Sequence, residues 1–238
     1  MNCLIILTHI YKLVKYKSIY SYMHKYIKYK NKYIELKTKY IHTPKILLLT
    51  FPHASCPTYL QDSRKCDIAT QNICNIFVKQ LTHEGIKYES IFNSLILRSD
   101  CDLNRAVCHK TSENKTEDTD FIKNIKNKLD NTYLLLDIHS FHENKNNDDF
   151  YILYNHKHKF DAEKLLEYLN LKLNLKLNMY PGGDNYIINT AATISTNTAL
   201  LFEFKEAQDE NNPGSDLTNN RNNLIINIIS WIKQIYTH

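Results

Sequence analysis

Three residues that can bind a metal or move a proton belong to, or closely follow, short apolar runs in this sequence. His53 follows KILLLTF and a proline, His139 lies in YLLLDIHSFH, and Glu203 lies in ALLFEF. Apolar runs of this length are typical of buried strands, and sites in α/β sheets form where such strands end. A histidine there can bind a metal through one ring nitrogen while a neighbour, such as Asp137, holds the other. These residues therefore indicate a candidate metal site.

Two arginines add a second chemistry. Arg98 and Arg105 lie at the two ends of RSDCDLNR, in a chain that otherwise uses lysine for most of its cations. The planar guanidinium group binds a carboxylate through two hydrogen bonds, so this pair indicates a site for a substrate carboxylate. Salt bridges to the neighbouring aspartates are the structural alternative. Zinc hydrolysis of an amide needs metal ligands, a carboxylate base and cations for the substrate, and each role has a candidate here.

The elements that must position these residues follow from the spacing of apolar side chains. Strands that alternate with helices favour an α/β fold of three layers, αβα, with a mixed, mainly parallel central sheet. The predicted strands cover residues 45–51, 88–97, 133–138, 150–154 and 199–204, and a further strand is expected at 33–39, ahead of a turn. The predicted helices cover 121–129, 161–177, 224–236 and the stretch between Asp67 and Gly85, while 211–223 is expected to be a loop.

Composition sets limits on the class of protein. The chain has 238 residues and a hydrophobic fraction of 43%, with no apolar run of the roughly 18 residues that a membrane span needs. The net charge of +5 comes largely from the first 44 residues, where Glu35 is the only acid. We expect a basic, Tyr/Lys-rich extension at 1–40 and a catalytic domain at 41–238. A solvated helix or hairpin explains the basic stretch better than contact with nucleic acid, which we do not expect as a partner.

Cysteine usage points to the compartment. The six cysteines form no CxxC pair, and the first residues have neither a basic segment nor a small-residue cleavage site. We therefore expect reduced thiols and a cytoplasmic location.

The order of the motifs resembles the N-formylglutamate amidohydrolase family, a relative of the zinc carboxypeptidases. The matching pieces are PHAS, an aspartate ahead of a helix, RSDCDLNR, LLDIHS and LFEF, and they span about residues 45–211. The most specific piece is the arginine followed by a short spacer and DLNR. The resemblance implies a zinc-carboxypeptidase-like fold and an enzyme that uses Zn²⁺ to cleave an amide bond.

The resemblance also implies a role for each candidate. His53 and His139 would be zinc ligands, and Glu203 the general base and later the general acid. Asn104 and Arg105 would bind the substrate's carboxylate or polarise its carbonyl, with Arg98 close by. The sequence carries all six residues.

The third zinc ligand has two candidates. Carboxypeptidases have a glutamate three residues after the first histidine, where this chain has Cys56. Asp67, the aspartate ahead of the next helix, is the better match to the amidohydrolases, and a Cys56 thiolate is the alternative because soft ligands suit zinc.

The expected substrate is a small N-acyl amino acid, such as an N-formylglutamate-like compound, or a small peptide with a free carboxylate. The alternative is a catalytically impaired carboxypeptidase-like fold that acts as a binding module, with its basic N-terminus on nucleic acid or another acidic surface.

Overall fold

The computed structural model describes residues 27–30, 32, 45–53, 67, 69–93, 102–105, 108, 118–141, 147–195, 197–206 and 216–236. The chain divides into two compact units, Met1–Pro44 and Lys45–His238. In the first unit, residues 27–30 and 32 are helical. Whether residues 1–40 act as a separate extension stays a prediction. The predicted elements before residue 45 otherwise lie outside the described residues.

A six-stranded sheet forms the centre of the second unit. Its strands lie in the order β2-β1-β3-β6-β4-β5. The first four in this order run parallel, whereas β4 is antiparallel to β6 and parallel to β5. The sheet is therefore mixed and mainly parallel. The strands are β1 (Ile46–Phe51), β2 (Tyr88–Phe92), β3 (Thr132–Phe141), β4 (Phe150–Tyr154), β5 (Leu177–Pro181) and β6 (Thr198–Lys205).

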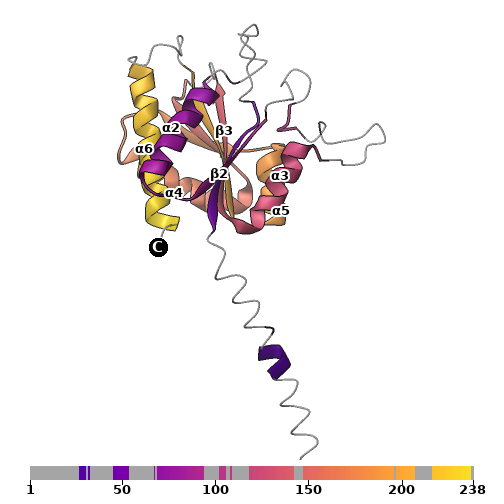
Figure 1. Ribbon diagram of the computed structural model, residues 1–238. Coiled ribbons are helices and arrows are strands. Elements are labelled where there is room, and N and C mark those ends of the chain that lie inside the picture. The colour runs from indigo at the N-terminus through magenta and orange to yellow at the C-terminus, as the bar shows by residue number, and fades with distance from the viewer. Residues whose placement is uncertain are drawn as a thin grey trace, which may run out of the picture. The chain divides into compact units, whose positions relative to one another are not determined.

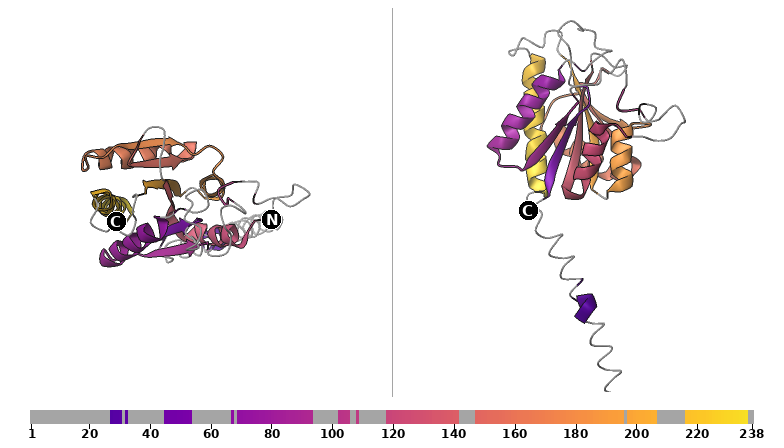
Figure 2. Two further views of the ribbon diagram at one scale, coloured as in Figure 1. Left: turned by 90° about the horizontal axis from the view of Figure 1, so that it is seen from above. Right: turned by 45° about the vertical axis from the view of Figure 1, so that its right-hand side comes forward.

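Helices cover both faces of the sheet, which gives the three layers (Figures 1 and 2). One face packs on α2 (Thr70–His83), α4 (Lys159–Asn170) and α6 (Asp216–Tyr236). The opposite face packs on α3 (Asp120–Lys128) and α5 (Tyr186–Ile194). Two short 3-10 helices, η2 (Leu129–Asn131) and η3 (His156–His158), precede β3 and α4.

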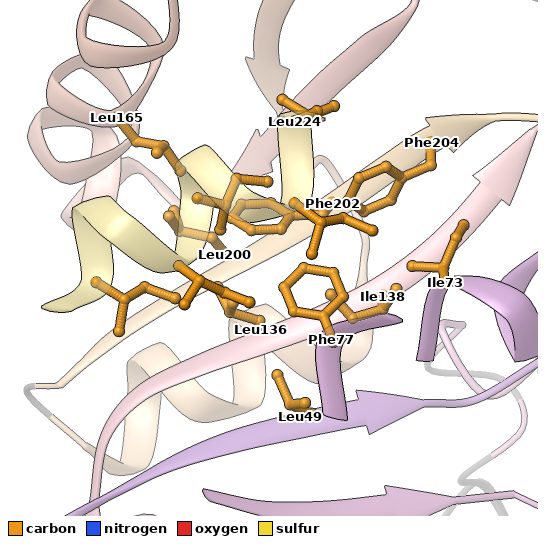
Figure 3. Close-up of a cluster of buried hydrophobic side chains, with 14 of the residues drawn as sticks. Leu49, Ile73, Phe77, Leu136, Ile138, Leu165, Leu200, Phe202, Phe204 and Leu224 are labelled. Carbon is orange, nitrogen blue, oxygen red and sulfur yellow. The ribbon is translucent and has the colours of Figure 1, made fainter. Parts of the chain in front are cut away.

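The larger core lies between the sheet and the α2–α4–α6 layer (Figure 3). Phe77 of α2 and Leu165 of α4 meet strand residues such as Leu49, Leu136 and Phe202, and all five are fully buried. Burying each such side chain contributes about 1.5–3 kcal/mol. Because the central strands are covered on both faces, they are continuous apolar runs, and the polar Asp137, His139 and Glu203 stand out among them.

Both helices of the second layer, α3 and α5, have capped N-termini. The side chain of Thr119 accepts a hydrogen bond from the Ile122 N–H, and Asn185 Oδ1 accepts one from the Ile188 N–H at 3.0 Å. Such caps satisfy N–H groups that have no partner inside the helix. The first residue of α5 is also tied to the candidate site, because the Tyr186 N–H donates to the Asn104 carbonyl at 2.7 Å.

Several predicted boundaries were wrong. The helix expected at 161–177 ends at Asn170, and the next regular element is β5. The leucines at 171, 173, 175 and 177 alternate with polar residues, which is the period of extended chain and not of a helix. Helix α6 begins at Asp216, inside the stretch expected to be a loop, and α5 was not predicted. Residues 94–97 of the predicted second strand lie outside the described part.

Two further expectations concern membranes and thiols. Among the residues that the structure describes, none of the helices has the length and hydrophobicity that a membrane crossing requires.

Two cysteines are described: Cys74 is a free, buried thiol and Cys108 is disulfide-bonded. The expectation of reduced thiols is therefore wrong for Cys108. Since disulfides are rare in the cytosol, this bond gives no support to a cytoplasmic location.

Candidate functional site

His53 lies just beyond the end of β1. Its side chain is buried, with 2% of the residue exposed, and its Nε2 lies 3.1 Å from Asp102 Oδ1. The backbone joins it to a second predicted ligand, because the His53 carbonyl accepts a hydrogen bond from the Asp67 N–H at 3.2 Å. His53, just beyond β1, and Asp67, just ahead of α2, therefore lie at the same edge of the sheet.

Asp67 meets His139 directly. Asp67 Oδ2 lies 2.9 Å from His139 Nδ1, and both side chains are buried. The rings of His53 and His139 also lie side by side, with centroids 5.2 Å apart and planes at 65°. The fold thus gathers the three side chains that the sequence proposed as metal ligands, although His53 and His139 are 86 residues apart in the chain.

A second carboxylate holds the other side of His139. Asp137 Oδ2 lies 3.1 Å from His139 Nε2, and Thr50 Oγ1 donates to Asp137 Oδ1 at 2.6 Å. Asn104 Nδ2 lies 2.9 Å from the same Nε2. Residues two apart on a strand point to one face of the sheet, which is why Asp137 can support His139. A carboxylate on the far nitrogen of a histidine is a common support for metal-binding histidines.

The surroundings of His139 shift its pKa. Burial by itself lowers the pKa of His139, but the charges and hydrogen bonds of Asp137 and Asp67 outweigh it. Together they hold the pKa of His139 well above its ordinary value. The His139 ring therefore lies between two buried carboxylates.

Glu203 lies on the neighbouring strand, level with His139. The two residues pair in the parallel register of β3 and β6, so they share a face and one strand spacing, about 4.8 Å, separates their backbones. Glu203 is partly buried and lines a cavity of about 90 Å³ together with Asp102, Asn104 and Arg105. A carboxylate in this place can exchange a proton with a molecule bound next to His139.

Arg105 is engaged by acidic side chains. Its Nη1 forms an ion pair with Asp184, and its Nε lies 3.8 Å from Asp102 Oδ2. The Arg105 and Asp184 side chains are 51% and 76% exposed, so the pair lies at the rim of the site. The contact with Asp102 agrees with the salt bridge that the sequence offered as an alternative, whereas Asp184, 79 residues further along the chain, carries no sequence signal.

Asp102 is a second residue that the sequence analysis left without a role in the site. It lies between His53 and Arg105 and also accepts a hydrogen bond from the Asn104 N–H at 3.0 Å. Its position at the start of DLNR was the sequence feature that could have indicated a role in the site. Arg98 and Cys56 lie outside the described residues, so their predicted roles stay predictions.

The suitability of the site for zinc depends on its donors. Within the described part of the chain, no group of three His, Cys, Asp or Glu side chains has an arrangement that could hold a metal ion. The candidates instead pair with one another, since Asp67 and His139 are at hydrogen-bond distance. Their types do fit: two imidazoles and a carboxylate, with Asp137 behind one imidazole, are a donor set that zinc accepts.

The comparisons with known proteins concern the fold. No family model and no curated protein sequence matches the chain. A gene product from Agrobacterium tumefaciens matches with a TM-score of 0.55 and 12% identity, over 82% of this chain and 94% of that one. Murine aminoacylase 3 matches with a TM-score of 0.52 and 12% identity, over 82% of this chain and 67% of that one. The chain shares its fold with an aminoacylase. The predicted three-layer, zinc-carboxypeptidase-like fold is confirmed.

A third match is weaker. The N-acetylmuramyl-L-alanine amidase Ami1 from Mycobacterium abscessus has a TM-score of 0.44 and 14% identity, over 79% of this chain and 98% of that one. At the identities of the two stronger matches only the fold is established.

Proposed function

We propose that this chain is a zinc-dependent amidohydrolase. Its substrate would be a small N-acyl amino acid, N-formylglutamate-like, or a small peptide with a free carboxylate, and it would belong with the N-formylglutamate amidohydrolases. One observation carries the proposal: His53, Asp67 and His139 gather at one edge of the sheet, with Glu203 level with His139 on the next strand.

In this proposal His53, Asp67 and His139 hold the zinc ion, and Asp137 fixes the ring of His139 from behind. When bound, zinc would polarise the amide carbonyl and make a water molecule acidic enough to attack near neutral pH. Asp67 is preferred over Cys56 because its carboxylate already contacts a second candidate ligand.

Glu203 would move the proton. Its carboxylate takes a proton from the attacking water and passes it to the amide nitrogen as the C–N bond breaks, which leaves an amine and a carboxylic acid. Arg105 and Asn104, which line the cavity with Glu203, would bind the substrate's carboxylate or carbonyl oxygen, with Arg98 as a further contact. Asn104 Oδ1 is buried and has no hydrogen-bond partner among the described residues, so a bound group can supply one.

The experiment is a measurement of metal content and turnover on the purified full chain. We expect about one zinc per chain and hydrolysis of at least one of the formyl, acetyl and succinyl derivatives of glutamate. Asp67→Asn should bind zinc more weakly than the wild type. Asp161→Asn, which alters a carboxylate bonded to Thr198 on the α4 side of the molecule, is the matched control. A wild type that binds zinc no better than Asp67→Asn would refute the metal site.

A second candidate function has its own observation. Asp67 already bonds His139 and Asp184 already bonds Arg105, so part of the site is satisfied by its own side chains. This favours an impaired enzyme that acts as a binding module, with the basic N-terminal residues on nucleic acid or another acidic surface. Such binding should weaken steeply with salt and disappear when residues 1–40 are deleted. Cytoplasmic location also stays a proposal, and cell fractionation tests it.

A further inference from the structure

Tyr151 of β4 lies beside the proposed base. It pairs with Glu203 across the antiparallel β4–β6 ladder, and Glu203 in turn pairs with His139. Side chains that are level on neighbouring strands point to the same face of a sheet. Leu153, two residues further along β4 on the same face, lines the cavity that contains Glu203. Tyr151 therefore extends the row of His139 and Glu203 by one strand.

Packing fixes the ring of Tyr151. The ring centroid lies 4.9 Å from that of Phe141 on β3 and 5.5 Å from that of Tyr180 on β5. The residue is only partly buried. A ring held from both sides gives its hydroxyl a defined position, as a group that must meet a substrate requires.

The hydroxyl of Tyr151 differs from that of its neighbour. Tyr180 donates its O–H to Asp148 Oδ2 at 2.8 Å, and Asp148 is fully buried. The Tyr151 hydroxyl, in contrast, makes no hydrogen bond with a residue that the structure describes. Burial first, and then the negative charge of Glu203, raise the pKa of Tyr151, so the phenol keeps its proton and remains a donor.

We propose that Tyr151 is a further catalytic residue whose hydroxyl donates a hydrogen bond to the bound substrate beside Glu203. The inference rests on the proposed function. As water adds to the amide carbon, negative charge develops on the former carbonyl oxygen, and a fixed donor that faces this oxygen lowers the barrier. Glu203 handles the proton while Tyr151 keeps its own throughout.

The test compares two tyrosines that pack on each other. In the zinc-loaded full chain, Tyr151→Phe and Tyr180→Phe each remove one hydroxyl and keep the ring. With N-formyl-L-glutamate and N-acetyl-L-glutamate as probes, Tyr151→Phe should lower kcat about 100- to 1000-fold and change KM less than threefold, as loss of an oxyanion donor does. Its Tm should equal that of the wild type. Tyr180→Phe should lower the Tm, because Asp148 loses a partner, and change kcat less than threefold.

The outcomes separate this inference from the function on which it rests. A wild type with no turnover on any N-acyl amino acid refutes the proposed function. An active wild type with an equally active Tyr151→Phe refutes the role of Tyr151 alone. A Tyr151→Phe variant whose Tm falls as far as that of Tyr180→Phe also overturns the inference, because the hydroxyl would then be a structural group.

Discussion

Replacement of Thr50 by valine tests the buried support of the site. Thr50 and Asp137 are both fully buried, and the Thr50 hydroxyl donates to Asp137 Oδ1 at 2.6 Å. A hydrogen bond to a charged group contributes about 1.5–3 kcal/mol, and an unpaired buried acceptor adds its own penalty. Because valine has nearly the same shape, Thr50→Val should lower the free energy of unfolding by about 1.5–3 kcal/mol with little loss of packing.

Thr132→Val is the matched control. Thr132 is equally buried, at 0% exposure, and lies on β3, but its hydroxyl donates to the carbonyl of Lys128 at 2.8 Å. A bond between neutral groups contributes about 0.5–1.5 kcal/mol. Urea unfolding of both variants, fitted with a common m value, measures the two losses. If Thr50→Val lowers the free energy of unfolding no more than Thr132→Val does, the hydrogen bond from Thr50 to Asp137 is no stronger than one between neutral groups, and the prediction is wrong.

Three further predictions concern charge and access. Asp184→Asn should tighten the binding of N-acetyl-L-glutamate up to about fivefold. The reason is that an exposed ion pair, which contributes about 0.2–1 kcal/mol, no longer competes with the ligand for Arg105. Titration calorimetry measures the dissociation constant. Asp137→Asn should weaken zinc binding about 10- to 100-fold in a chelator competition, as loss of a carboxylate behind a ligand does. Burial raises the pKa of Cys74 to about 11. At pH 8 this thiol should therefore react with a disulfide reagent roughly a hundredfold more slowly in the folded than in the unfolded chain. Peptide mapping of the labelled cysteine measures the two rates.

Each of these predictions can fail. Asp120→Asn, which alters a 95% exposed carboxylate paired with Lys123, is the control for Asp184→Asn. If the two variants bind N-acetyl-L-glutamate equally tightly, Asp184 does not compete with the ligand for Arg105. Unchanged zinc affinity in Asp137→Asn would show that Asp137 does not support a ligand. Fast labelling of Cys74 in the folded chain would contradict its burial.

The sequence predicted the strands that hold the site, because they are covered on both faces. Strands β1, β3 and β6 are continuous apolar runs, so Asp137, His139 and Glu203 stand out within them. The order of strands could not be predicted. Nothing in the sequence states that β6 inserts between β3 and β4, which is what brings Glu203 level with both His139 and Tyr151.

Contacts made by loops were also beyond prediction. The pairing of Arg105 with Asp184 joins two turns 79 residues apart, and no periodic pattern marks either turn. Helix α5 was missed because its sequence, YIINTAATI, is rich in β-branched residues, which have low helix propensity. Its start at Tyr186 depends on the Asn185 cap and the bond to the Asn104 carbonyl, which only tertiary structure supplies.

The most direct test of the proposed activity is the turnover of Glu203→Gln. The variant keeps the size of the side chain and removes its capacity to take a proton. The zinc-loaded wild type should hydrolyse N-formyl-L-glutamate or a close N-acyl analogue. Glu203→Gln should keep the zinc and lose about 100- to 10,000-fold in kcat, while Glu163→Gln, an exposed residue of α4, should match the wild type. Equal turnover by Glu203→Gln and the wild type would contradict the proposed mechanism.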